Sequence, residues 1–206
     1  DMQHSNKYIF IYSIIMVVVI AVSLTIVAVK LKPAQEDNIR IEKMQNILSS
    51  VNIPTTEIPK KQVIDVYNKF IKVAFGVNNK GEVVEQDAAK VFAIELANEL
   101  KKPVEKQVLP VYIAVLEGGD SAYIVPLRGK GLWGPVWGYI SFKSDFNTIF
   151  GTTFDHKGET PGLGAEINQD GVDAISGGTI TSKGVEKMLL DNLTNYEAYF
   201  KKHMTK

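Results

Sequence analysis

The stretch VLPVYIAVLEGGDSAYIVPL, residues 108–127, sets the fold class of this chain. It contains two apolar, strand-like runs, Val108–Leu116 and Ala122–Leu127, on either side of the sequence EGGD at 117–120. Two β-forming runs joined by a short turn that contains glycine are typical of an antiparallel hairpin. The stretch therefore predicts an antiparallel sheet.

Further strand-like runs lie on both sides of this hairpin. They are found at 70–77, 82–85, 136–143 and 146–154, and a turn sequence, NNKG, joins the first two. Helices are expected at 34–51, 60–68, 87–102 and 183–204, where apolar residues recur at helical spacing among charges. This order predicts an α+β domain of mainly antiparallel sheet with flanking helices.

A run without charged residues precedes this domain. Tyr8–Val29 would form a helix about 33 Å long at about 1.5 Å per residue, which is enough to cross a bilayer core of about 30 Å. A cleaved signal peptide is the alternative, but its apolar region is usually about 7–15 residues long and ends at a small-residue cleavage site. Here Lys30-Leu31-Lys32-Pro33 follows. We expect a tail at 1–7, a retained transmembrane helix at 8–31 and a helix with a connector at 32–59.

Composition excludes several kinds of chemistry. The 206 residues include no cysteine, so Fe–S clusters and thiol catalysis are excluded. The formal net charge of zero does not favour nucleic acid as a partner. The three histidines lie far apart, so we expect no metal site.

Three glycine-rich segments, 129–138, 156–164 and 173–182, are the candidates for a binding site. Each has an ordinary explanation: a strand-linking loop with core tryptophans, a proline turn, and a helix cap supplied by Thr181 or Ser182. The functional alternatives are a planar ligand beside Trp133 and a phosphate group at the start of the last helix. Neither GxxxxGK[ST] nor GxGxxG is present, so a nucleotide site of these types is not supported.

The segment DAISGGT, residues 173–179, resembles the D-x-x-S-G-A-T signature of FMN-binding subunits in bacterial respiratory complexes. The sequences GLWG at 131–134 and ETPGLG at 159–164 also resemble segments of that family, in the same order and behind one N-terminal span. GLWGPV and GVDAIS resemble the C subunits of Na+-translocating NADH:quinone oxidoreductases more than the G subunits of Rnf complexes. An Rnf-type protein is one alternative, and a non-redox, membrane-anchored binding module is another.

The resemblance implies FMN bound covalently, through a phosphoester that a flavin transferase forms on Thr179. It implies no catalytic side chain, because the flavin carries the redox chemistry. The residues alone do not choose between the hydroxyls of Thr179 and Thr181. The other implied FMN contacts are Ser176, Gly177, Gly178 and Thr181 around the phosphate, Leu132 and Trp133 beside the ring system, and Thr160, Leu163 and Gly164 against it. Asp173 is implied to be read by the transferase.

The resemblance further implies an FMN-binding domain at 60–206 that relays electrons from NADH towards quinone, without oxidising NADH alone. The implied partners are other subunits of the complex, the transferase and membrane lipid. The implied location is the bacterial inner membrane, with one span and a periplasmic FMN domain. Lys7 before the span and Lys30 and Lys32 after it favour the opposite orientation.

The chain departs from the family pattern in two places. Gly178 replaces the alanine of the signature. Only residues 165–172 separate the ETPGLG segment from the signature, where family members usually have tens of residues. Either the chain is a shortened variant, or a segment has been lost from it.

Overall fold

The computed structural model describes residues 6–55, 57–168 and 178–204. The chain forms two compact units, Asp1–Glu42 and Lys43–Lys206. The first unit contains most of α1 (Asn6–Ser49), and the last turns of α1 belong to the second.

Helix α1 is the one described helix that is long and apolar enough to cross a membrane. It was expected as two helices, because proline removes a backbone donor and disfavours helix before it. Instead α1 continues through Pro33 and ends at Ser49. The residues after Pro33 form helix well, and Lys32 and Glu36 form an ion pair across it, with 3.8 Å between Nζ and Oε1.

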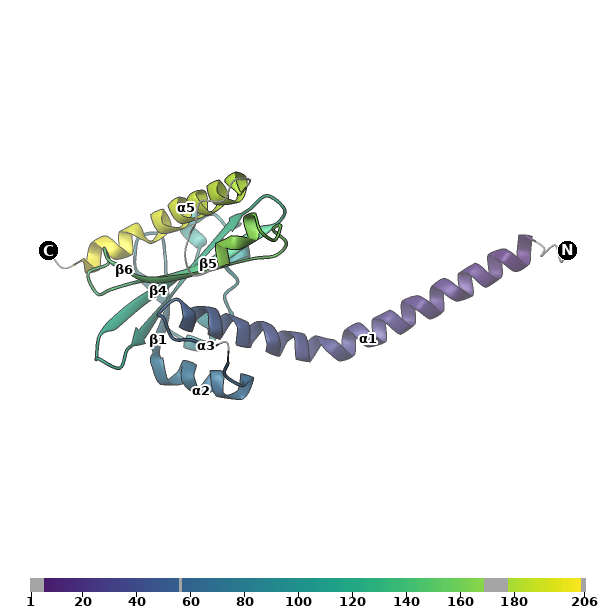
Figure 1. Cartoon of the computed structure of the whole chain (residues 1–206), viewed down its shortest axis with the longest axis horizontal. Helices are drawn as coiled ribbons and strands as arrows, with labels where there is room; N and C mark the ends of the chain where they lie inside the picture. Colours follow the sequence, from purple (N-terminus) through teal and green to yellow (C-terminus); the bar gives the residue numbers. More distant parts are fainter. Residues whose placement is uncertain (1–5, 56, 169–177, 205–206) are drawn as a thin grey trace. The chain divides into compact units, whose positions relative to one another are not determined.

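The second unit is built on one six-stranded sheet (Figure 1). Its elements after α1 are α2 (Lys60–Phe70), β1 (Ile71–Val77), β2 (Val83–Glu85), α3 (Ala88–Ala93), α4 (Leu96–Glu99), η1 (Val104–Lys106), β3 (Leu109–Val115), β4 (Ser121–Lys130), β5 (Pro135–Phe142), β6 (Ile149–His156), η2 (Gly164–Asn168) and α5 (Thr179–His203). The strand order is β2-β1-β3-β4-β5-β6, and every neighbouring pair is antiparallel. The α+β prediction is therefore confirmed.

The expected hairpin forms at the centre of this sheet. Tyr112 pairs with Ile124 and Val115 with Ser121, and the turn is closed by a hydrogen bond from the Leu116 amide to the Asp120 carbonyl (2.9 Å). In Figure 1, α5 lies on one side of the sheet, and α2 and α3 lie on the other. Because side chains alternate along a strand, each strand supplies apolar residues to both layers.

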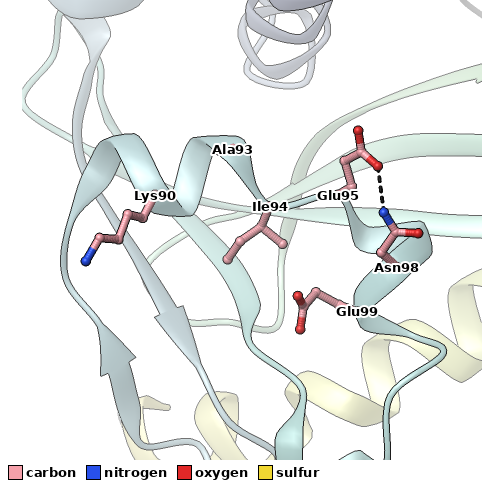
Figure 2. A pocket seen from close by; sticks show the side chains of 6 residues that line it. All are labelled: Lys90, Ala93, Ile94, Glu95, Asn98 and Glu99. Atoms are coloured by element: carbon pink, nitrogen blue, oxygen red, sulfur yellow. Dashed lines mark hydrogen bonds between the residues drawn. The ribbon is translucent and has the colours of Figure 1, made fainter.

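The prediction of one helix at 87–102 is wrong, because this stretch forms two short helices, α3 and α4. Ile94 and Glu95 between them are extended, with ψ angles of 124° and 105° (Figure 2). Lys43 Nζ donates to the carbonyl oxygens of Phe92 and Ile94, so a side chain satisfies groups that a longer helix would have satisfied internally. Burial lowers the pKa of Lys43 to about 8, although the nearby charge of Glu95 opposes this shift.

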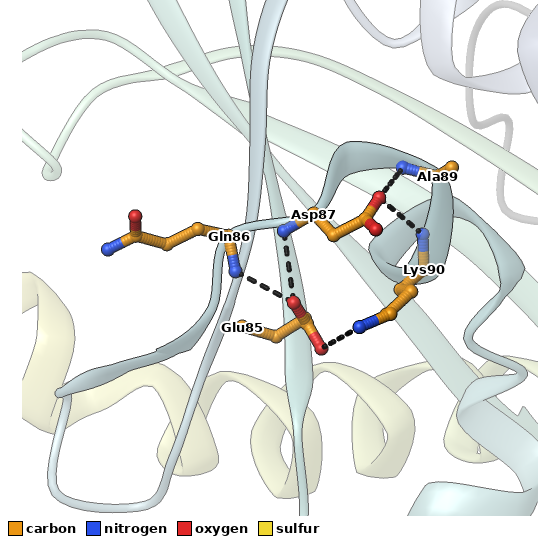
Figure 3. A network of polar contacts seen from close by, with 5 residues as sticks. All are labelled: Glu85, Gln86, Asp87, Ala89 and Lys90. Atoms are coloured by element: carbon orange, nitrogen blue, oxygen red, sulfur yellow. Dashed lines mark hydrogen bonds and ion pairs between the residues drawn. The ribbon is translucent and has the colours of Figure 1, made fainter.

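A polar network fixes the start of α3 (Figure 3). Asp87 is the N-cap, and its Oδ1 accepts from the amides of Ala89 (2.9 Å) and Lys90 (3.3 Å). Glu85 Oε1 accepts from the amides of Gln86 and Asp87, and Glu85 Oε2 lies 3.8 Å from Lys90 Nζ. This cap explains why α3 forms even though it is only a turn and a half long.

The core between α5 and the sheet is apolar and aromatic. From α5 it includes Met188, Tyr196, Tyr199 and Phe200, and from the strands it includes Leu127, Val136 and Ile140. Tyr196 is buried and donates its hydroxyl to the Pro110 carbonyl (3.0 Å). Tyr112 is also buried, but its hydroxyl has no hydrogen-bond partner among the described residues.

These two tyrosines provide a matched test of the core. We expect Tyr196→Phe to lower the free energy of unfolding by about 1 kcal/mol, because the Pro110 carbonyl loses its donor. Tyr112→Phe should leave that free energy unchanged or raise it by up to about 1 kcal/mol, because it removes a buried hydroxyl without a partner. Urea unfolding of the two variants beside the parent would measure both. Equal losses in the two variants would show that the hydroxyl of Tyr112 is satisfied.

Candidate functional site

The first glycine-rich segment is mostly strand. Residues 129–130 end β4 and residues 135–138 begin β5, so the loop is only Gly131–Gly134, shorter than expected. It is closed by a hydrogen bond from the Gly131 amide to the Gly134 carbonyl (2.8 Å). Trp137 is therefore a strand residue, while Trp133 lies at the loop tip and is 69% exposed.

The second segment leaves the end of β6 and enters η2. The Thr160 carbonyl accepts from the amides of Leu163 and Ala165 (both 3.1 Å), which forms a compact turn. Gly162 lies at a φ of 73°, a conformation that favours glycine. Glu159, at the start of the turn, is only 4% exposed.

The third segment begins α5 at Thr179, four residues earlier than expected. Gly178 is the N-cap, so the expected cap by Thr181 or Ser182 is wrong. Thr181 is inside the helix and 2% exposed, and its Oγ1 donates to Glu159 Oε2 (2.5 Å). Ser182 Oγ donates back to the Gly178 carbonyl (3.1 Å).

The carboxylate of Glu159 joins all three segments. Its Oε1 accepts from the amide of Trp133 (2.9 Å), and its Oε2 accepts from Thr181. Glycine makes room for it, because a Cβ on Gly131 would lie 2.5 Å from Oε1 and a Cβ on Gly164 would lie 2.7 Å from Oε2. Segments that are far apart in sequence therefore converge on one buried acid.

The hydrogen bonds around Glu159 control its ionisation. Burial alone would raise its pKa, but the bonds from Thr181 and from the amides of residues 132–134 outweigh burial, and the pKa lies below its ordinary value. The carboxylate therefore remains charged at neutral pH, although it is buried.

This lowered pKa predicts a loss of stability in acid. A group whose pKa is lower in the folded state stabilises the fold above its unfolded pKa, and that contribution disappears as the pH falls through the folded value. We expect the free energy of unfolding to decrease below about pH 4 more steeply in the parent than in Glu159→Gln, which cannot titrate there. Urea unfolding at a series of pH values would measure this difference. Parallel curves would show that Glu159 has an ordinary pKa.

Four exposed apolar side chains lie in the segments that meet at this junction. Leu132 and Trp133 precede β5, Leu163 adjoins Gly164, and Ile180 lies between Thr179 and Thr181. Their exposed fractions are 42%, 69%, 39% and 58%, respectively. Thr179 is exposed as well, and exposed apolar side chains of this kind suit a planar, largely apolar ring system.

The start of α5 also suits an anion. The first amides of a helix have no intrahelical acceptor, and the helix dipole is positive at that end. No described side chain caps these amides at Gly178. A phosphate ester on Thr179, the first residue of α5, would lie at this positive end.

The structure brings together most of the predicted residues of the site. Those that lie at the junction or in its loops are Leu132, Trp133, Thr160, Leu163, Gly164, Gly178, Thr179 and Thr181. Ser176, Gly177 and Asp173 lie outside the described residues. Sequence reasoning missed Glu159 and Ile180. An acid at the start of a turn rich in proline and glycine was the available signal for Glu159.

Open grooves elsewhere do not involve these segments. One lies beside α3 and α4, lined by Lys90, Ile94, Glu95 and Glu99 among others, and Figure 2 shows their side chains. Glu99 accepts there from the amide of Val108 (3.1 Å), so it stabilises the chain before β3. Among the described residues, no group of three or more His, Asp or Glu side chains could hold a metal ion.

Comparison with known proteins supports the grouping of the three segments. A family model described as an FMN-binding domain matches residues 131–194, which include most of the first segment and all of the other two. The C subunit of the Na(+)-translocating NADH-quinone reductase of Haemophilus ducreyi is 30% identical, over 77% of this chain and 78% of that protein. The chain belongs to this family of C subunits. The C subunit of Neisseria meningitidis serogroup A is also 30% identical, over 83% of this chain and 85% of that protein.

Solved structures of this family show the same fold. The C subunit from Parabacteroides distasonis has a TM-score of 0.71 and 39% identity, and the match covers 82% of this chain and 96% of that one. NqrC from Shewanella oneidensis has a TM-score of 0.64 over 79% of this chain and 96% of that one, and at 22% identity it shows the fold alone. The expected resemblance to C subunits is therefore confirmed, and it is favoured over the Rnf-type alternative.

The alignment with one relative also contains gaps in this chain. The alignment with the H. ducreyi protein extends over 204 residues but covers only 77% of this chain. That relative therefore contains inserted residues that this chain lacks.

Proposed function

We propose that this chain carries FMN joined to Thr179 by a phosphoester and relays electrons within a Na+-translocating NADH-quinone reductase. The observation that carries the proposal is the contrast between two hydroxyls at the start of α5. Thr181 is buried and bonded to Glu159, whereas Thr179 is exposed on the helix end. Of these two hydroxyls, that of Thr179 offers the oxygen that both a transferase and the flavin phosphate could reach.

The attachment step needs an activated flavin. The Thr179 oxygen would form a bond to the flavin phosphorus of a phosphoanhydride donor such as FAD. The anhydride bond would break, AMP would leave, and the hydroxyl proton would pass to solvent. The chain would thereby gain FMN less one water, without a catalytic side chain of its own.

The residues around Thr179 fit the attached group. The amides at the start of α5, which no described side chain caps, and the helix dipole favour the negative phosphate. Leu132, Trp133 and Leu163 offer apolar surface to the ring system, and η2 and the Thr160 turn bound the site on the side of β6. Bound FMN supplies the redox chemistry, and this chain binds and orients it.

The family's named reaction defines the role that we propose for the carrier. Electrons would arrive from NADH through other subunits and leave towards quinone, with Na+ moved across the membrane. The partners would be those subunits, a flavin transferase and membrane lipid. Because no dinucleotide motif is present, we expect no NADH oxidation by this chain alone.

We further propose that α1 anchors the chain in the inner membrane, with the FMN domain, residues 60–206, on the periplasmic side. The chain has no cysteine, so a single introduced thiol can be labelled specifically. Gly118, in the exposed turn between β3 and β4, is a suitable site because an added Cβ meets only Asp120 Oδ2, at 4.0 Å. We expect Gly118→Cys to react with a membrane-impermeant maleimide in intact cells.

A cytoplasmic control supports that measurement. The same label should react with a cytosolic thiol protein only after lysis. Labelling of Gly118→Cys only after lysis would reverse the proposed orientation and would agree with the lysines that flank the span.

The direct test of the proposed function is the mass of the intact protein. The chain would be expressed with a flavin transferase and membrane targeting, and its peptides would then be mapped. We expect a gain equal to FMN less one water, located on the peptide that contains Thr179. An unmodified mass, obtained with a transferase that is active on a control substrate, would refute covalent attachment and favour a non-redox module.

A further inference from the structure

The two carboxylate oxygens of Glu159 accept hydrogen bonds from two different segments, and the proposed function assigns this residue no role. Glu159 Oε1 accepts from the Trp133 amide in the loop before β5, and Oε2 accepts from Thr181 in the first turn of α5. Its own amide donates to His156 Nδ1 (3.2 Å) at the end of β6. One residue therefore connects two loops to the first turn of the helix that begins at Thr179.

We propose that Glu159 is a positioning residue, whose bond to Thr181 holds the start of α5 against the Trp133 loop and so fixes the Thr179 hydroxyl relative to the ring-binding surface. The inference rests on the proposed function and adds the residue that organises its site. Because Glu159 is only 4% exposed, it would act through Thr181 and not by contact with the flavin.

No other described hydrogen bond performs this task. Among residues 6–55, 57–168 and 178–204, the bond from Thr181 Oγ1 to Glu159 is the only one that joins the first turn of α5 to the loops at 131–134 and 159–164. The next polar link between α5 and the sheet is Asn192, which bonds the backbone of Arg128 further along the helix. Without the Thr181 hydroxyl, no hydrogen bond among the described residues would join the first turn of α5 to these loops.

The chemistry of a carboxylate suits this position. It only accepts hydrogen bonds, and both neighbours, the Trp133 amide and the Thr181 hydroxyl, can donate. A glutamine of the same shape brings an NH2 group to one side. If its oxygen accepts from the Trp133 amide, the hydroxyl proton of Thr181 loses its acceptor. The NH2 group would then donate to the Thr181 oxygen, so Glu159→Gln keeps the volume but replaces a bond to a charged acceptor with a weaker neutral one.

The matching change on α5 is Thr181→Val, which removes the hydroxyl with little change in volume. Thr181→Ser restores the hydroxyl and serves as the rescue variant. Thr194→Val is the control on the same helix, because Thr194 is exposed and its hydroxyl bonds only the Leu190 carbonyl four residues earlier (2.7 Å).

The test measures flavin attachment and flavin mobility at a temperature where circular dichroism shows every variant to be folded. With transferase and FAD, we expect Thr181→Val and Glu159→Gln to be modified about tenfold more slowly than the parent, because a hydrogen bond to a charged acceptor is lost. The fluorescence anisotropy of the attached flavin should fall in both. Thr181→Ser and Thr194→Val should match the parent in both measurements.

The outcomes separate the two proposals. An unmodified parent would overturn the proposed function, and the positioning role of Glu159 with it. A modified parent together with a Thr181→Val variant that matches it in rate and in anisotropy would overturn the positioning role alone. A loss of stability in Thr181→Val without a change in either measurement would also overturn it, because the bond would then be purely structural.

Discussion

Thr179→Ala is expected to abolish covalent FMN attachment completely. Thr179 is the first residue of α5 and is exposed, whereas Thr181 is buried. Alanine removes the oxygen that would form the phosphoester. Thr181 cannot replace it, because Thr181 is only 2% exposed and its hydroxyl is bonded to Glu159. Intact mass and flavin fluorescence of the denatured protein would both show no flavin.

The fold of this variant should be unaffected. Alanine has a higher helix propensity than threonine, so a change at the exposed start of α5 should alter the free energy of unfolding by no more than about 0.5 kcal/mol. Ser182→Ala is the control for the same turn, because its hydroxyl bonds only the Gly178 carbonyl, and it should be modified like the parent. Flavin retained on Thr179→Ala, mapped to Thr181 or Ser182, would contradict the choice of Thr179.

Gly184→Ala is expected to destabilise the fold. On an exposed helix, alanine in place of glycine would stabilise by about 1 kcal/mol. Here the added Cβ would overlap the carbonyl oxygen of Lys130 and lie 3.3 Å from the Cα of Gly131. Because both neighbours are backbone atoms, α5 itself must move away from β4. We expect a net loss of about 1–3 kcal/mol in the free energy of unfolding, measured by urea unfolding.

The same shift should reach the site. Gly184 lies one turn after Thr181, so moving this part of α5 lengthens the bond between Thr181 and Glu159. Flavin attachment to the Gly184→Ala variant should therefore slow as well. Gly118→Ala is the matched control, because its Cβ meets only Asp120 Oδ2, at 4.0 Å, and it should change neither stability nor attachment measurably. A Gly184→Ala variant more stable than the parent would show that helix propensity outweighs the close approach to β4.

Local sequence patterns located the strands better than the helices. Alternation and turn residues were informative, because half-buried strands repeat every two residues and their turns demand particular residue types. The prediction of a single helix at 87–102 failed because Lys43, distant in sequence, donates to the carbonyls of Phe92 and Ile94 between α3 and α4. Helix propensity therefore decided less than a tertiary hydrogen bond did.

At the start of α5, a distant residue also overrode a prediction made from local sequence. Hydroxyl residues before a helix usually cap it, and on that basis Thr181 or Ser182 was expected to be the N-cap. In the fold, Glu159 takes the Thr181 hydroxyl as a donor, and the helix begins at Thr179 instead. The partner that changed the outcome lies 22 positions earlier, where local pattern reasoning does not reach.

The sequence by itself determined the antiparallel α+β class, the apolar N-terminal helix and the three segments that identify the family of C subunits. These depend on local periodicity and on residue types in short motifs, which a linear chain displays directly. Only the tertiary structure decided that the segments meet at Glu159, that the Thr181 hydroxyl is bonded to Glu159, and that Thr179 is exposed at the start of α5. Such choices depend on which side chains become buried beside one another, and burial is a property of the folded chain alone.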